Sequence, residues 1–237
     1  MIVNYTENGW EIITQRVHGL LAGQICARWK ISEQPPRWAE TLIATTEHDD
    51  VFNEFQFGPL LTESGGPMDF KMTCFNEQAC RQMIEMALSK SRFIALLFAR
   101  HIGFTHGSEP AAKPYLKGLK KLGTKWMKEA DSNTVEVNLA YELLEFCDAF
   151  SLLICQGQIP PEERKLEISK GPNGVSYQFF QKENRLIVMP WPFEIESFDV
   201  HYECRILKDL RFKSETEFKK ALQNATVELR KLAISAS

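Results

Sequence analysis

Two histidines and two aspartates in this sequence have the residue types of a divalent-metal site. They are His18, the adjacent pair His48 and Asp49, and Asp148. Imidazole nitrogens and carboxylate oxygens form a mixed ligand set that suits divalent Mn, Fe, Co, Ni or Zn and leaves positions for water or substrate. The residue types therefore predict a bound divalent metal ion, provided that the fold brings the four side chains together.

The spacing of apolar residues places His18 and Asp148 on the inward faces of two helices. Side chains at positions i, i+4 and i+7 share one face of a helix, so His18 lies on a stripe with Ala22 and Ile25. Asp148 lies on a similar stripe with Leu144. A carboxylate on an inward face would be buried, and a buried charge without a partner is costly. Asp148 therefore needs a cation nearby.

The pair His48–Asp49 comes at the predicted end of a helix that begins near Pro35 and Pro36, because proline suits a first helical turn. Adjacent side chains normally diverge along a helix. At its last turn, however, an imidazole and a carboxylate can converge on one ion.

Each of these positions also has an interpretation without a metal. His18 could be a core histidine bonded to a carbonyl, and His48–Asp49 could cap the C-terminus of its helix, where a cationic imidazole suits the helix dipole. Asp148 could pair with Arg92 or Arg100. All three interpretations would have to hold together for the metal site to be absent.

Two further histidines lie in the middle of the chain. His101 shares a helical stripe with Leu97 and is expected to face inward, whereas His106 follows Gly103 and need not lie on the same helix. Either histidine could bind a second metal ion or a phosphate group. We expect His101 and Asp49 to be the catalytic residues.

Hydrophobic periodicity and turn residues predict the elements that position these side chains. The N-terminal part is expected to contain a hairpin within residues 1–14 and helices over 14–30, 35–49, 76–101 and 131–155. Residues 51–75 are expected to be irregular, and so long a loop in a compact domain is often functional. A run of lysines (Lys113, Lys117, Lys120, Lys121 and Lys125) is interpreted as a solvated helix face.

The pattern changes after Pro160 and Pro161. A hairpin is expected over 175–182 and 185–189, and a strand over 198–206, where apolar residues alternate with polar ones. The capping box Ser214–Glu217 predicts a final helix. Its inward residues would be Phe218, Leu222, Ala225, Leu229 and Leu232.

These elements predict a mainly α fold, in which a helical bundle carries a small antiparallel β-sheet built from the N-terminal hairpin and the C-terminal region. Residues 1–159 would form the helical domain with its hairpin. Residues 160–237 would form a β-rich appendage with a final helix, packed on the same domain.

Composition and charge narrow the class of protein. The chain has 237 residues, 44% hydrophobic and 25% charged, with a net charge of −3, so neither a nucleic-acid nor a membrane partner is indicated. The start has no signal-peptide pattern, no segment is apolar enough to cross a bilayer, and the six cysteines form no C-x-x-C pair. We expect a cytoplasmic protein.

The order of the candidate ligands resembles the H…HD…D signature of the HD-domain metal-dependent phosphohydrolase superfamily. The resemblance covers residues 14–155 and implies that His18, His48, Asp49 and Asp148 bind the metal and that the substrate is a nucleotide or another small phosphate ester. The chain differs from the usual signature in having Asp50–Val51 after the HD pair. Two short segments, 10–15 with His18 following and 190–193, also resemble an uncharacterised bacterial family with no assigned activity.

Three functions follow from the resemblance. In the first, a metal-activated water attacks the phosphorus of a phosphate ester, with Asp49 orienting the water and His101 stabilising the phosphate oxygens. The second is an HD-fold di-iron oxygenase, which would use all six of the ligands His18, His48, Asp49, His101, His106 and Asp148. The third is a non-catalytic protein that binds a metabolite or a partner through the aromatic loop. Motifs for nucleotide phosphates, serine hydrolases and dinucleotides are missing from the sequence.

Overall fold

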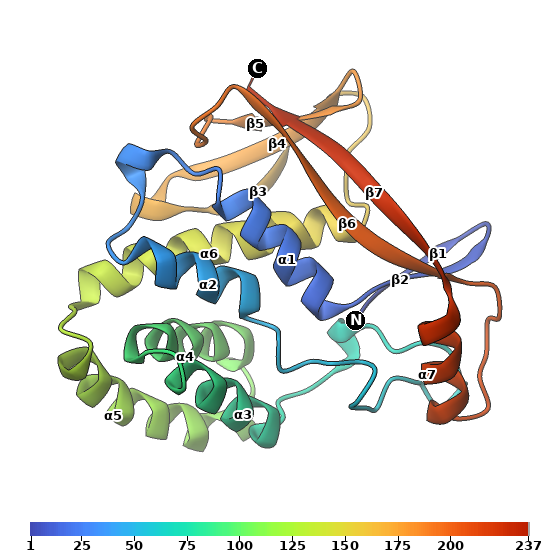
Figure 1. Cartoon of the computed structure of the whole chain (residues 1–237), viewed down its shortest axis with the longest axis horizontal. Helices are drawn as coiled ribbons and strands as arrows, with labels where there is room; N and C mark the ends of the chain where they lie inside the picture. The colour runs from blue at the N-terminus through green and yellow to red at the C-terminus, as the bar shows by residue number, and fades with distance from the viewer. Residues whose placement is uncertain (237) are drawn as a thin grey trace.

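A computed structural model describes residues 1–236 of the chain, in which most of the helices occupy one side of the molecule and a curled β-sheet with the last helix the other (Figure 1). The α-helices are α1 (Gln15–Cys26), α2 (Trp38–Glu47), α3 (Glu77–Leu88), α4 (Arg92–His106), α5 (Lys113–Glu129), α6 (Thr134–Cys155) and α7 (Glu215–Asn224). The strands are β1 (Ile2–Thr6), β2 (Gly9–Ile13), β3 (Leu166–Lys170), β4 (Ser176–Lys182), β5 (Arg185–Met189), β6 (Ser197–Leu207) and β7 (Thr226–Ser235).

Side-chain caps fix where most of the helices begin. Thr14 accepts a hydrogen bond from the backbone of Val17 at the start of α1, and Asn133 accepts two from the first turn of α6. Such caps satisfy backbone N–H groups that have no partner within the helix. The two helices that carry His18 and Asp148 therefore have defined starting points, and they begin where the sequence predicts.

The strands form one seven-stranded sheet in the order β1-β2-β6-β7-β5-β4-β3. Neighbouring strands are antiparallel except β5 and β7, which are parallel. β7 pairs with β6 along its whole length, from Ser235 opposite Ser197 to Thr226 opposite Ile206. The sheet thus joins the N-terminal hairpin to strands from the last third of the chain.

The predicted fold class is wrong. The chain is 47% helical and about 22% strand, which makes it an α/β protein rather than a helical bundle with a small sheet. The sheet is also mixed rather than antiparallel, because β5 and β7 run in the same direction. Most of the additional strand lies in β3 and β7. The sequence pattern predicted no element for β3 and predicted a helix where β7 lies.

Two predicted helices differ from those in the structure. The helix predicted over 76–101 is two helices, α3 and α4, because Ser91 ends the first segment by capping the second through Ile94. The helix predicted from Ser214 stops at Asn224, and the chain continues as β7. Leu229 is 51% exposed there, instead of facing inward.

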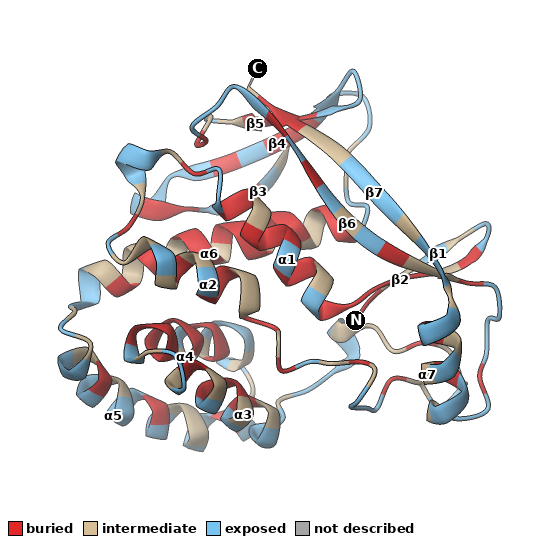
Figure 2. Cartoon of the chain, in the orientation of Figure 1, coloured by how far each residue is buried: buried red, intermediate tan, exposed pale blue. Residues whose placement is uncertain are grey.

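The site helices lie between two hydrophobic clusters (Figure 2). α1 and α6 pack against each other and against the sheet, around fully buried residues such as Trp29, Phe150 and Phe179. The other side of α6 contacts α4 and contributes to a second cluster that also contains residues of α3 and α5 and in which Phe93 and Leu97 are buried. α6 therefore holds Asp148 rigidly between two packed layers.

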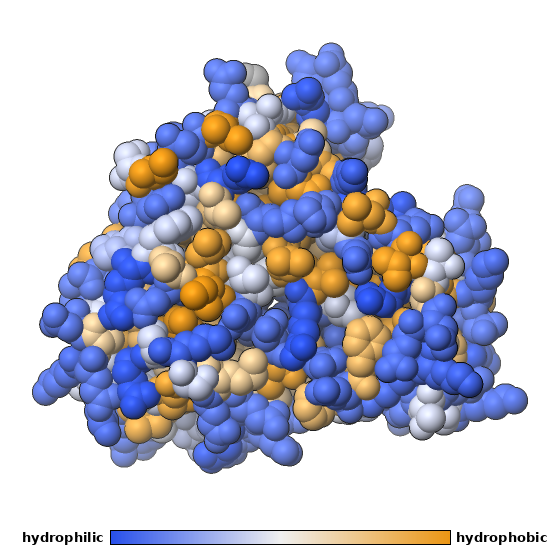
Figure 3. Space-filling model, viewed as in Figure 1, coloured by the Kyte–Doolittle hydropathy of each residue, from blue (hydrophilic) through white to orange (hydrophobic). Residues whose placement is uncertain are grey.

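The outer surface is mixed in polarity. On the face shown in Figure 3, hydrophobic groups are separated by hydrophilic side chains. The predicted lysine run lies on α5, and all five of its lysines are exposed, as expected for a solvated helix face. Among the helices within residues 1–236, none combines the length and apolar character needed to span a membrane.

Candidate metal centre

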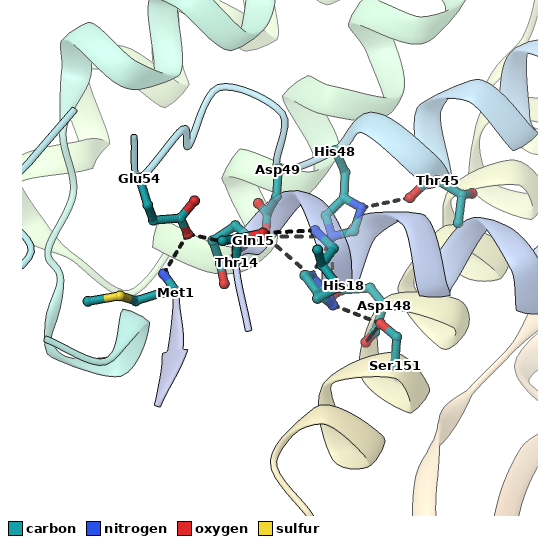
Figure 4. A network of polar contacts seen from close by, with 11 residues as sticks. Met1, Thr14, Gln15, His18, Thr45, His48, Asp49, Glu54, Asp148 and Ser151 are labelled. Atoms are coloured by element: carbon teal, nitrogen blue, oxygen red, sulfur yellow. Dashed lines mark hydrogen bonds and ion pairs between the residues drawn. The ribbon is translucent and has the colours of Figure 1, made fainter. Parts of the chain in front are cut away.

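The four predicted ligands converge from three helices. His18 comes from α1, His48 and Asp49 follow the last turn of α2, and Asp148 comes from α6. Figure 4 shows the four side chains directed toward one another. The two imidazoles are completely buried and each aspartate is only 8% exposed. The structure thus brings together all four residues that the sequence singles out.

The distances between the ligand atoms are short, from 3.1 to 3.8 Å. The Nε2 atoms of His18 and His48 are 3.1 Å apart, and Oδ1 of Asp148 lies 3.4 Å from the first and 3.3 Å from the second. Oδ2 of Asp49 lies 3.3 Å from Nε2 of His18 and 3.8 Å from Nε2 of His48. Donor atoms about 2.1 Å from a common ion would be about 3.0 Å apart in an octahedral site and about 3.4 Å apart in a tetrahedral one. Four of the five separations lie in that range, and the separation between Asp49 and His48, at 3.8 Å, is longer.

Hydrogen bonds to the outer ring nitrogens fix which nitrogen of each imidazole faces the centre. Nδ1 of His48 donates to the backbone carbonyl of Thr45 at 2.8 Å. Nδ1 of His18 lies 2.8 Å from Oγ of Ser151, whose own proton goes to the carbonyl of Asp148. Both Nδ1 atoms therefore carry protons, so in the neutral rings both Nε2 lone pairs point at the same space.

Two imidazole nitrogens beside two carboxylates make this buried space electronegative, so it stabilises a positive charge. Burial opposes protonation of His48, but Asp49 and Asp148 outweigh it and raise the pKa of His48 to about 9. Burial likewise opposes ionisation of Asp49, yet the charge of His48, together with the hydrogen-bond contact to His18, holds the pKa of Asp49 well below its usual range. The pKa of Asp148 is lowered against burial in the same way. A divalent cation would balance the two carboxylate charges more fully than one proton can.

His101 lies next to this cluster. Its ring centroid is 5.0 Å from that of His48, and His48, His101 and Asp148 form a second group whose ligand atoms lie within 4.8 Å of one another. Burial, followed by the charge of His48, lowers the pKa of His101. Within residues 1–236, Nδ1 of this buried ring has no hydrogen-bond partner. His101 is therefore a neutral imidazole with an unused polar atom beside the candidate ligands.

The structure does not bring His106 to the cluster. Nδ1 of His106 lies 2.6 Å from Oε1 of Glu109, and its ring packs edge-on against Phe75. It belongs to α4, one turn and a half beyond His101. The six-ligand set of the oxygenase hypothesis is therefore not assembled.

Sequence reasoning missed the residues that hold the ligands in place. Gln15 donates its side-chain N–H to Oδ2 of Asp49 at 2.8 Å, while Ser151 and Thr45 orient the two histidines. Gln15 precedes His18 by three residues, and Ser151 follows Asp148 by three. The i+3 spacing, which places each on the same helix face as a ligand, was the signal that could have found them.

Two of the three interpretations without a metal differ from the structure, and the third, a C-terminal cap at His48, agrees with it. Nδ1 of His18 meets the Ser151 hydroxyl rather than a backbone carbonyl. Arg92 pairs with Glu129, at 2.7 Å, instead of Asp148. His48 does stand at the C-cap of α2, but its Nε2 faces the cluster.

A cavity of about 820 Å³ opens onto the cluster. Asp49, Asp148 and His101 lie in its wall together with Gln15. The irregular segment 51–76, α3 and α4 enclose the rest of the space. A small molecule could therefore reach the cluster from the surface.

These features define an α/β protein with buried His/Asp clusters that could hold a metal ion. A family model, described as a protein family of unknown function (DUF3891), matches residues 1–209, so the chain belongs to that family. No curated protein and no solved structure gives a match to the chain.

Proposed function

We propose that this protein is a metal-dependent hydrolase that binds one divalent cation through His18, His48, Asp49 and Asp148 and cleaves a phosphate ester. The observation that carries the proposal is the pair of Nε2 atoms, 3.1 Å apart, with a carboxylate oxygen on either side. Without a metal ion, the single extra proton on His48, whose pKa is raised to about 9, would have to offset the lone pair of His18 and two negative charges in a buried space. The order of these ligands along the chain also resembles the H…HD…D signature.

The donor set fits a catalytic metal. A bound divalent cation would supply Lewis acidity and would lower the pKa of a coordinated water enough to form hydroxide near neutral pH. Two imidazoles and two carboxylates leave coordination positions open, and the cavity reaches the cluster.

Residues next to the candidate ligands can orient a ligand and contact a substrate. Gln15 holds Oδ2 of Asp49, which keeps that carboxylate in a fixed orientation. The other oxygen of Asp49 can accept a proton from a nearby water. His101 is neutral and has an unpartnered ring nitrogen, so it can donate a hydrogen bond to a substrate oxygen beside the cluster.

Metal analysis of four purified proteins tests the proposal. The wild type should take up one equivalent of Mn, Fe, Co, Ni or Zn, while Asp49→Ala and Asp148→Ala should each bind the ion at least tenfold more weakly. Asp199→Ala is the matched control, because Asp199 is exposed on β6 and belongs to neither of the His/Asp groups that could hold a metal ion. Equal metal content in all four proteins would refute the metal site.

The reaction itself needs a separate measurement. The metal-loaded wild type and Asp199→Ala should hydrolyse p-nitrophenyl phosphate or its diester, and Asp49→Ala should not. Metal uptake without hydrolysis of either ester would leave the metal site standing and refute the phosphohydrolase.

A further inference from the structure

The cavity beside the candidate metal centre is large and mostly apolar away from the cluster. Its volume of about 820 Å³ lies within the range that holds small-molecule ligands. Phe70, Phe75, Met68, Met83 and Leu152 are among the side chains that line it. Methionine and phenylalanine walls adapt to irregular apolar ligands rather than to sugars or bases with many polar groups.

The charges on the cavity wall restrict the ligand further. Among residues 1–236, no lysine or arginine side chain lines the cavity, whereas Asp49, Glu54 and Asp148 do. Glu54 is already engaged, because it accepts a hydrogen bond from the backbone of Gln15 and pairs with the N-terminal ammonium group of Met1. Proteins bind di- and triphosphates with arginine and lysine clusters. A polyanionic nucleotide would find no such partner here.

The mouth of the cavity is apolar as well. Four residues that line it are also substantially exposed: Phe52, Phe57, Met72 and Phe104. Three of the four belong to the irregular segment 51–76. Large apolar side chains held at the surface around a cavity are typical of a binding site for an apolar group.

We infer that the cavity binds the long apolar chain of an amphiphilic substrate, whose single phosphate group lies at the metal centre. This inference rests on the proposed hydrolase and names its substrate class. The cluster supplies one site for an anionic head, with His101 beside it, and the remaining space offers apolar surface. An alkyl phosphate satisfies both parts, and a nucleotide or a sugar phosphate satisfies only the first.

Binding of a chain-length series tests the inference. Butyl, hexyl and octyl phosphate, below their micelle concentrations, are titrated into the metal-loaded protein by calorimetry. Each added methylene should tighten binding roughly fourfold until the cavity is full. Adenosine monophosphate and glucose 6-phosphate should bind at least tenfold more weakly than octyl phosphate. Affinity that does not change with chain length, or a nucleotide that binds as tightly as octyl phosphate, would overturn the inference.

A cavity-filling variant and a matched control locate the binding. Ala79 lines the cavity on α3, so Ala79→Trp should remove most of the dependence on chain length while metal content stays at the wild-type level. Ala111 is exposed and does not line the cavity, so Ala111→Trp should bind the series like the wild type. If the two variants behave alike, the chains bind elsewhere. If Ala79→Trp does not fold, the dependence of wild-type affinity on chain length still tests the inference.

The metal-free protein separates failure of the inference from failure of the proposed function. Octanol, which has no anionic head, should bind the chelator-treated protein and should be excluded by Ala79→Trp. Octanol binding by a protein that takes up no metal would refute the hydrolase and leave the apolar site. Metal uptake and ester hydrolysis without any effect of chain length would refute the apolar site and leave the hydrolase.

Discussion

At the scale of single residues, the candidate centre depends on hydrogen bonds made away from it. A neutral histidine presents Nε2 to a cation only while Nδ1 carries the proton. Here a backbone carbonyl and a serine hydroxyl accept hydrogen bonds from the two Nδ1–H groups. The carbonyl of Thr45 can only accept, so the orientation of His48 is set by the main chain. The orientation of His18 depends instead on the Ser151 side chain, which a substitution can remove.

Ser151→Ala should therefore weaken metal binding without removing a ligand. Loss of the hydroxyl leaves Nδ1 of the buried His18 ring without its acceptor, and loss of such a contact typically costs 10- to 100-fold in metal affinity. Competition with a metal-binding dye measures the affinity. Ser197→Ala, at an exposed position on β6, is the control and should match the wild type. Unchanged affinity in Ser151→Ala would show that packing alone orients His18.

The metal-free protein should become less stable as the pH rises above neutrality. The pKa of His48 in the folded chain is about 9, against its usual 6.5, so its contribution is fully present below pH 6.5 and is lost as the pH rises through 9. The shift corresponds to about 3 kcal/mol. The lowered pKa of Asp49 acts at the opposite end, since its contribution is present above pH 3.8 and is lost in acid.

Urea unfolding in the presence of a chelator, at pH 6.5, 7.5 and 8.5, measures this slope. The unfolding free energy should fall across the series in the wild type and in His201→Gln, whose histidine is exposed on β6. It should stay nearly constant in His48→Gln. A wild-type stability that is flat from pH 6.5 to 8.5 would contradict the charge network described for His48.

At the scale of elements, α1 and α2 must approach closely for His18 and His48 to meet. Two glycines of α1 permit this approach. A Cβ atom on Gly19 would lie 2.6 Å from the backbone oxygen of Thr46, and one on Gly23 would lie 2.2 Å from its side-chain oxygen. Because glycine has no side chain, Gly19 and Gly23 of α1 allow α2 to come close enough for the two imidazoles to meet.

Gly19→Ala should separate the two helices and weaken the site. The obstacle at Gly19 is backbone and cannot rotate away, so we expect a loss of about 1–3 kcal/mol in stability together with lower metal affinity. Gly118→Ala on α5 is the matched control, because a Cβ there meets nothing within 4 Å and alanine favours a helix by up to about 1 kcal/mol. A Gly19→Ala protein as stable as Gly118→Ala would mean that α2 shifts without cost.

The elements that sequence analysis predicted are those whose signal is local. α1 and α6 have a capping residue and a continuous apolar stripe, so both helices and their inward ligands were predicted. The break at Ser91 was missed because Ala87 and Ile94, seven residues apart, keep the helical spacing across it. β7 was missed because Leu222, Leu229 and Leu232 continue a helical pattern.

What makes β7 a strand is a partner distant along the chain. It pairs with β6 on one side and with β5 on the other, and neither pairing can be read from local periodicity. The same limit applies to the site. The sequence indicated which four residues could bind a metal, but not that Gln15 and Ser151 would orient them or that His106 would pair with Glu109.

At the scale of the whole molecule, the candidate ligands connect elements that also hold the sheet. α1 and α6 pack on each other, and residues of both belong to the same hydrophobic cluster as Phe179 and Val200 of the sheet. α2 packs on α1, α4 and α6. A cation bound to His18, His48 and Asp148 would therefore link three helices that are in contact with most of the fold.

A divalent cation should consequently stabilise the entire chain in one step. At a free concentration of 100 times the dissociation constant, binding to the folded state alone adds about 2.7 kcal/mol, or roughly 5–10 °C in melting temperature for a chain of this size. Circular dichroism at 222 nm and tryptophan fluorescence should report the same increase, because helices and sheet share one core. Asp148→Ala, with its at least tenfold weaker binding, should show at most about half of this increase at that metal concentration, and Asp199→Ala should show the full increase. A metal-dependent shift in only one of the two signals would mean that the sheet unfolds independently of the helices that carry the site.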